Sequence, residues 1–81
     1  MDEILLERIR EIIAGTFGVD EQDLDANTSA QTLSAWTSLA HLRLLTNLQS
    51  AFGVRFTMGE MTDLNSVQAI ERTLTARGVS A

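Results

Sequence analysis

Cysteine, proline and lysine are all missing from this chain of 81 residues. Because it has no cysteine, the chain can form neither a disulfide nor a site that depends on a thiolate, whether nucleophilic or metal-binding. Because it has no proline, helices can run uninterrupted between turns made of glycine and polar residues. The apolar runs are too short to span a membrane, and no basic and then apolar leader follows Met1. We therefore predict a cytoplasmic protein without a membrane partner, folded as a single domain over residues 1–81.

Positive charge is scarce as well, since all six basic residues are arginine and the formal net charge is −5. Proteins bind nucleic acid largely by neutralising phosphate with basic side chains, so this composition argues against a nucleic-acid partner. Acidic residues gather early in the chain, at Asp20, Glu21, Asp23 and Asp25. Because their spacing lacks the glycine and the terminal glutamate of a calcium loop, we interpret this stretch as a solvated loop and predict no metal site.

Apolar residues at intervals of three and four predict a first helix over residues 2–16. The residues concerned are Leu5, Ile9, Ile12 and Ile13. Gly18 is placed to end this helix. The following residues, 19–37, are mainly polar and form a connection too long to be unstructured in a compact domain. We expect its apolar side chains to hold it against the core, namely Val19, Leu24 and Leu33.

The same spacing predicts a second helix over residues 38–52, ended by Gly53. Its apolar row comprises Leu39, Leu42, Leu45, Leu48 and Phe52. A short helical turn is expected within residues 57–63. This arrangement places the longest connection directly before the second helix.

A capping pair, Asn65 and Gln68, should open the last helix. The buried stripe of that helix and its terminating glycine are Val67, Ile70, Leu74 and Gly78. No stretch alternates between polar and apolar residues as a strand does. The predicted fold class is therefore all-α, a small four-helix bundle with a long loop between its first two helices and a short third helix.

A candidate site lies where the long polar connection meets the second helix, at Thr37 and Ser38. Either hydroxyl can cap the helix by accepting a hydrogen bond from a free backbone N–H. A phosphate attached to Ser38 would face further free N–H groups and the positive end of the helix dipole. Serine and threonine begin many helices simply as caps, however, so this position alone favours a capping role over an attachment point.

The residues around this serine, 36–42, read Trp-Thr-Ser-Leu-Ala-His-Leu. They resemble the Asp-Ser-Leu motif of acyl and peptidyl carrier proteins, in the Trp-Asp-Ser-Leu form common among polyketide-type carriers. The resemblance covers nearly the whole chain. Further matches occur at Phe17-Gly18-Val19, Phe52-Gly53-Val54, Phe56, Glu60-Met61, Leu64-Asn65-Ser66-Val67 and Ile70.

The resemblance implies that Ser38 carries a covalent 4′-phosphopantetheine arm, whose thiol holds an acyl intermediate as a thioester. It implies an acyl carrier protein rather than an enzyme, acting in polyketide, specialised fatty-acid or mixed biosynthesis. A phosphopantetheinyl transferase would attach the arm, and acyltransferase, ligase or ketosynthase-type enzymes would be the other partners of a monomeric carrier. In the family, the second and third helices line a groove for the acyl chain, and the matching positions here are Leu42, Val54, Met58 and Met61.

Two features depart from the family pattern. Thr37 stands where the family has an aspartate that helps the modifying transferase recognise the carrier, and residues 38–52 contain no acidic side chain. Carriers usually present an acidic second helix to basic partners, so we expect dedicated partners with a neutral or acidic docking face. The recognition residues predicted here are Trp36, Thr37, Leu39, His41 and Arg43.

Two other functions stay open at this point. Thr37 is compatible with a carrier-like module that has lost modification and only binds proteins. A helical enzyme would need Ser38 and His41 as a catalytic pair, but a histidine one turn along the same helix points poorly for this role and no orienting acid is apparent. His41 is more simply a surface or half-buried helix residue. Trp36 either packs beneath the loop or frames the prosthetic arm.

Overall fold

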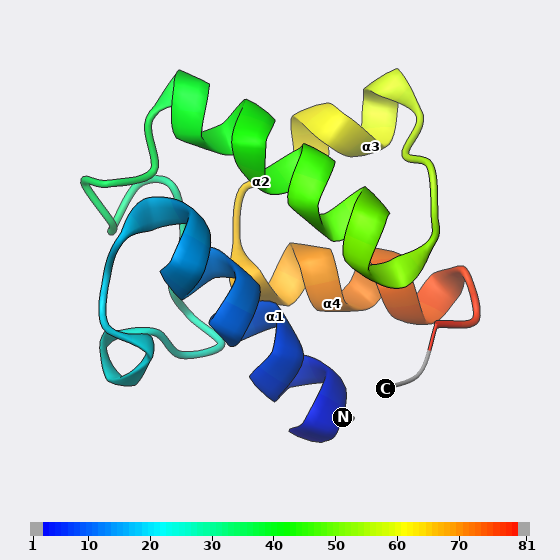
Figure 1. The fold of residues 1–81 in the computed structure, drawn as a ribbon. Coiled ribbons are helices and arrows are strands. Elements are labelled where there is room, and N and C mark those ends of the chain that lie inside the picture. The colour runs from blue at the N-terminus through cyan, green and yellow to red at the C-terminus, as the bar shows by residue number, and fades with distance from the viewer. Residues whose placement is uncertain (1–2, 80–81) are drawn as a thin grey trace.

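The computed structural model describes residues 3–79, which form helices joined by irregular segments (Figure 1). In chain order the elements are α1 Glu3–Phe17, the 3-10 turn η1 Glu21–Asp23, α2 Ser38–Phe52, α3 Met58–Asp63 and α4 Val67–Ala76. Within the described residues, extended pairing is limited to one isolated antiparallel bridge, between Ser29 and Ser66. The predicted all-α class, long first loop and short third helix are therefore confirmed. No helix in this part of the chain is both long and apolar enough to cross a bilayer.

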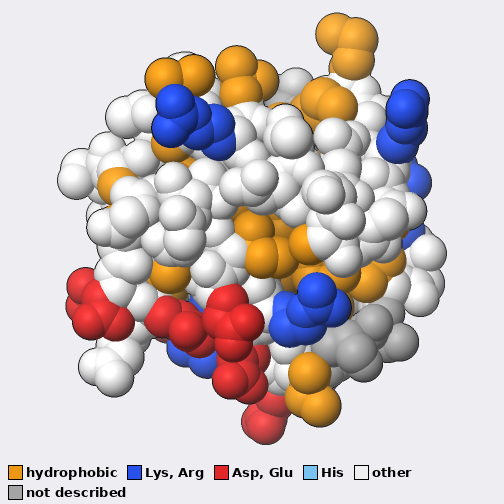
Figure 2. All heavy atoms as spheres, viewed as in Figure 1, with side chains coloured by type: hydrophobic (Ala, Val, Ile, Leu, Met, Phe, Trp, Pro, Cys, Tyr) orange, Lys and Arg blue, Asp and Glu red, His pale blue; other side chains and the backbone are white. Residues whose placement is uncertain are grey.

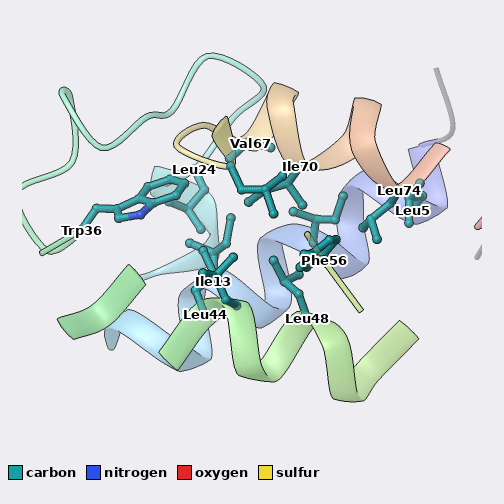
Figure 3. Close-up of a cluster of buried hydrophobic side chains, with 13 residues drawn as sticks. Leu5, Ile13, Leu24, Trp36, Leu44, Leu48, Phe56, Val67, Ile70 and Leu74 are labelled. Atoms are coloured by element: carbon teal, nitrogen blue, oxygen red, sulfur yellow. The ribbon is translucent and has the colours of Figure 1, made fainter. Parts of the chain in front are cut away.

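The hydrophobic core lies where α1 packs against both α2 and α4. Of the predicted stripes of the first and last helices, Ile12 is only partly buried against the core. The other members are buried, namely Leu5, Ile9, Ile13, Val67, Ile70 and Leu74. Figure 3 shows these side chains converging with those of α2, with Trp36 at one end of the cluster and Leu74 at the other. Burial of each such aliphatic side chain contributes roughly 1.5–3 kcal/mol, so this shared centre holds α1, α2 and α4 together.

The buried row of α2 differs from the predicted one. Leu44, Leu45 and Leu48 are buried, whereas Leu39 and Leu42 are each 61% exposed. The helix carries so many leucines that two neighbouring rows both match a helical period, and packing against α1 selects one of them. The predicted row is therefore wrong in its first half, and two exposed leucines lie beside the candidate serine.

Each helix after α1 begins at a hydroxyl side chain that accepts a hydrogen bond from an N–H of the first turn. Thr37 caps α2, Thr57 caps α3 and Ser66 caps α4. The predicted capping pair of Asn65 and Gln68 is wrong, because the hydroxyl of Ser66 lies one residue closer to the helix and takes this role. The helix-ending glycines are confirmed, and all of them have left-handed backbone: Gly18, Gly53 and Gly78.

The long connection between α1 and α2 is held in place by side chains and by backbone hydrogen bonds. Its apolar residues pack against the core as predicted, at Val19, Leu24 and Leu33. The Ala30 N–H donates to the Asn65 carbonyl at 2.9 Å, and the Val67 N–H donates to the Thr28 carbonyl at 2.9 Å. The middle of the connection is thereby fixed to the start of α4. The last residues of the connection then lead directly into the start of α2.

Glu60 joins the start of α3 to the end of α4. Its carboxylate accepts hydrogen bonds from the guanidinium of Arg77 and, at 2.8 Å, from the backbone N–H of Thr57. These contacts, that of Arg77 foremost, lower the pKa of Glu60 from 4.5 to about 2. Because the ionised carboxylate is the form that is bound, its stabilising effect is present above about pH 4.5 and is lost as the pH falls toward about 2.

We predict that Glu60→Gln lowers the urea midpoint of unfolding at neutral pH, and that its difference from the wild type disappears between about pH 4.5 and about pH 2. In that range the wild-type carboxylate takes up a proton and loses its charge-assisted hydrogen bonds. Asp63→Asn is the matched control, since Asp63 lies on the same helix and forms no ion pair within residues 3–79. A difference between wild type and Glu60→Gln that stays constant with pH would contradict this assignment.

A second prediction separates the two leucine rows of α2. Leu44→Ala should reduce the free energy of unfolding by roughly 2–5 kcal/mol, because it opens a cavity in the core. Leu42→Ala should change it by less than about 0.5 kcal/mol, because that side chain lies mostly in solvent. Urea denaturation of both variants measures the difference, and equal losses would show that the buried row is assigned incorrectly.

Candidate functional site

Ser38 is the first residue of α2 and its side chain is exposed. The hydroxyl of Thr37, the residue before it, accepts a hydrogen bond from the Ala40 N–H at 3.2 Å. Thr37 therefore serves as the cap, and the hydroxyl of Ser38 forms no hydrogen bond within residues 3–79. Of the two residues that the sequence allowed as the cap, the structure selects Thr37.

The start of α2 also fits a phosphate group attached to Ser38. The N–H groups of Ser38 and Leu39 find no acceptor within residues 3–79, as is usual for the first turn of a helix. These donors and the positive end of the helix dipole favour negative charge at this point. No acidic residue lies between Asp25 and Glu60 in the sequence. α2 therefore carries no negatively charged side chain that would repel a phosphate.

A hollow of about 420 Å³ opens beside Ser38. Its walls come from the long connection, the first turns of α2, the end of α3 and the segment between α3 and α4. The lining residues are Ala30, Trp36, Thr37, Ser38, His41, Leu42, Thr62 and Asn65. The lining contributions of Ala30, Thr62 and Asn65 were not predicted, because no periodicity in the sequence relates these residues to α2.

A chain of hydrogen bonds through His41 forms one wall of this hollow. The indole Nε1 of Trp36 donates to Nδ1 of His41 at 3.0 Å. An indole N–H can only donate, so Nδ1 is the acceptor and the hydrogen of the neutral ring lies on Nε2. Nε2 then donates to the carbonyl of Met61 at 2.9 Å. Both ring nitrogens are therefore occupied, and His41 is not placed to activate Ser38 as a nucleophile.

The predicted recognition residues differ in how much surface they offer. Thr37, Leu39 and Arg43 are exposed. Trp36 is only 6% exposed and packs on the ring of Phe17, with 5.3 Å between the ring centroids. The tryptophan thus packs beneath the loop and at the same time lines the hollow beside Ser38.

The predicted acyl-groove residues are not brought together in this hollow. Leu42 lines it, whereas Val54, Met58 and Met61 do not. Met58 is 83% exposed, and Val54 and Met61 are half-buried against the core. Of the predicted groove, the structure therefore places Leu42 alone in the hollow beside Ser38.

Three carboxylates of α1 and η1 approach one another, those of Glu7, Glu11 and Glu21, with oxygen atoms within 4.8 Å. The acidic stretch noted in the sequence contributes only Glu21 to this group. All three side chains remain accessible to water. We assign them no binding role, because none of the three side chains is buried and exposed acidic groups commonly gather without holding an ion.

The helical bundle thus presents an exposed serine at the start of α2, beside a histidine whose two ring nitrogens are both hydrogen-bonded elsewhere. The chain belongs to the phosphopantetheine-attachment family, since the family model described as "Phosphopantetheine attachment site" matches residues 7–74. It is therefore a non-catalytic carrier protein whose prosthetic group is a covalent 4′-phosphopantetheine. Proteins of this family interact with a phosphopantetheinyl transferase and with biosynthetic enzymes.

A solved structure supports this assignment. The chain is similar to the holo acyl carrier protein from Geobacter metallireducens, determined by solution NMR, with 28% sequence identity and a TM-score of 0.73. The similarity covers 89% of this chain and 87% of that protein. A search of curated proteins found no match.

The coupling between Trp36 and His41 can be measured with a double-mutant cycle. Trp36→Phe removes the indole N–H and leaves Nδ1 of His41 without a partner. We expect this loss to cost roughly 1 kcal/mol more in the wild-type background than in a His41→Ala background. Equal costs in the two backgrounds, measured by urea denaturation, would show that the hydrogen bond does not hold the loop to α2.

Proposed function

We propose that Ser38 is the attachment point of the 4′-phosphopantetheine arm. The observation that carries this proposal is the exposure of Ser38 at the start of α2, where the N–H groups of Ser38 and Leu39 have no acceptor within residues 3–79. The family match includes this position, within residues 7–74. Because Thr37 supplies the cap, modification of Ser38 would leave the helix start intact.

The residues around Ser38 have distinct roles in this proposal. The N–H groups of Ser38 and Leu39 bind and orient the phosphodiester. Trp36 and Leu42 offer apolar surface in the adjoining hollow, which shields part of the arm or cargo from water. When bound, the arm supplies a terminal thiol for thioester attachment of an acyl group.

For the pathway, we propose polyketide, specialised fatty-acid or mixed biosynthesis, with acyltransferase, ligase or ketosynthase-type partners. This finer assignment is based on the Trp-Thr-Ser-Leu sequence at residues 36–39, which resembles polyketide-type carriers. Contact with partners would involve the exposed residues Thr37, Leu39 and Arg43. Trp36 and His41 would act from inside, by holding the loop that leads to Ser38.

A second candidate is a carrier-like interaction module that is no longer modified. The observation that favours it is Thr37, which stands where the family has aspartate. The exposed Ser38 and the intact helix start favour the modified carrier over this alternative.

Modification is tested by incubating the chain with coenzyme A and either a broad-specificity phosphopantetheinyl transferase or that of the source organism. We expect the intact mass to rise by one phosphopantetheine. Ser38→Ala should abolish the gain, whereas Ser50→Ala, which removes another exposed serine of α2, should not.

The contrary result is equally clear. If neither transferase adds mass to the wild type, but both add it to Thr37→Asp, the site has lost its modification and the interaction module is the correct function.

A further inference from the structure

Gly15 lies within α1 and is exposed to solvent. Its backbone does not have the positive φ that would call for glycine. A Cβ atom built at this position would meet no atom within 4 Å. Glycine weakens a helix relative to alanine, because it loses more conformational freedom on folding. Neither backbone geometry nor packing within the described residues requires glycine here, so the space beside it is open to a group from outside the chain.

This space is part of a second hollow, of about 430 Å³, between α1 and α2. Its lining residues are Gly15, Thr16, Leu42, Arg43, Thr46 and Asn47. Leu42 also borders the hollow beside Ser38, so the two hollows adjoin along one side chain. Leu42 follows Ser38 by four residues, about one helical turn, which places the second hollow within reach of any protein that contacts Ser38.

The walls of the second hollow offer one free charged donor. The amide of Asn47 donates to Thr16 Oγ1 at 2.8 Å, and Thr16 donates in turn to the carbonyl of Ile12 at 2.7 Å. Thr46 donates to the carbonyl of Leu42 at 3.2 Å. The guanidinium of Arg43, in contrast, forms no ion pair or hydrogen bond within residues 3–79. The polar side chains of the hollow are therefore held by hydrogen bonds, while its one cation is unpaired within residues 3–79. Such a site can bind a carboxylate.

Charge on the rest of the surface restricts where such a carboxylate can bind. The net charge of the chain is −5, yet no acidic residue occurs between Asp25 and Glu60. On the face shown in Figure 2, acidic side chains gather over α1 and the connection after it, and none is seen over α2 and α3. A partner with an acidic docking face is repelled by the first region and attracted to α2, which carries Arg43 and no acidic residue, whereas α3 carries Glu60 and Asp63. This difference sets the orientation of the partner as well as its rate of association.

We propose that the second hollow receives an acidic side chain of the phosphopantetheinyl transferase that modifies Ser38. Its carboxylate pairs with Arg43, in the space left by Gly15, while the exposed Leu39 and Leu42 pack against apolar surface of the enzyme. This inference rests on the proposed function, because it takes Ser38 as the residue that the transferase must reach. It goes further in three respects: it names the transferase as the partner, it assigns a negative charge to the transferase group that contacts Arg43, and it includes Gly15 of α1 in the binding surface.

The test measures binding of the source organism's transferase, with coenzyme A present, to the chain carrying Ser38→Ala. Arg43→Glu and Gly15→Gln should each weaken binding by roughly tenfold, the first by reversing the charge and the second by filling the hollow. The matched controls are Arg55→Glu, an exposed arginine beyond α2, and Gly59→Gln, an exposed helical glycine of α3. Both controls should bind as the parent chain does.

Two further readouts separate docking from folding. Gly15→Gln should raise the Tm, because glutamine favours a helix more than glycine does, while it weakens binding. Replacing the matching acidic residue of the transferase by lysine should restore binding of Arg43→Glu. A purely structural role for Gly15 would move stability and binding in the same direction.

The proposal is overturned if the transferase does not bind, or if Arg43→Glu binds it as well as or better than the parent chain. It is overturned equally if Gly15→Gln binds the transferase as tightly as Gly59→Gln does. It is also overturned if sedimentation shows that these variants disrupt a dimer of the chain without affecting transferase binding. Because Ser38→Ala is present throughout, these outcomes do not depend on modification. Failure of the docking proposal is therefore distinguishable from failure of Ser38 to be modified, which the intact-mass experiment reports.

Discussion

The hydrogen bond from the Trp36 indole to Nδ1 of His41 determines how the region around Ser38 is built. This hydrogen bond fixes the last residues of the long polar connection to the first turns of α2. Nε2 of His41 donates a second hydrogen bond to the carbonyl of Met61, which ties the same residues to α3. Trp36 is anchored in the core, so the loop cannot move away from α2 without exposing a large aromatic side chain. With the loop held in this way, Thr37 caps the helix and Ser38 is left exposed beside a hollow.

Much of the fold follows from local signals in the sequence. The bounds of α2 and the glycine at its end were predicted because a hydroxyl cap, a leucine-rich helix and a left-handed glycine are each decided within a few residues. The buried face of α2 was not predicted correctly, because Leu42 and Leu44 both match a helical period and only contact with α1 distinguishes them. The start of α4 was misplaced by one residue for a related reason, since Asn65 and Ser66 are both good caps.

The candidate site, too, was predicted from the sequence only in part. Ser38 was found from sequence because it lies at a helix start within a motif-like segment, which is local information. The two hollows depend on contacts between distant segments, so no local pattern indicates that Asn65 lies beside Ser38 or that Gly15 lies beside Arg43. Of the two exposed leucines that the pattern assigned to the core, Leu42 borders both hollows in the structure, and Leu39 adds apolar surface next to Ser38.

The central claim is that α2 presents Ser38 so that a phosphodiester there meets the free N–H groups of the first turn. It is tested most directly by amide NMR spectra of the chain before and after incubation with coenzyme A and a phosphopantetheinyl transferase. The account predicts that the largest changes in amide shift occur at Ser38 and Leu39, with smaller changes along the adjoining hollow. Unchanged spectra, or largest changes at residues remote from the start of α2, would contradict it.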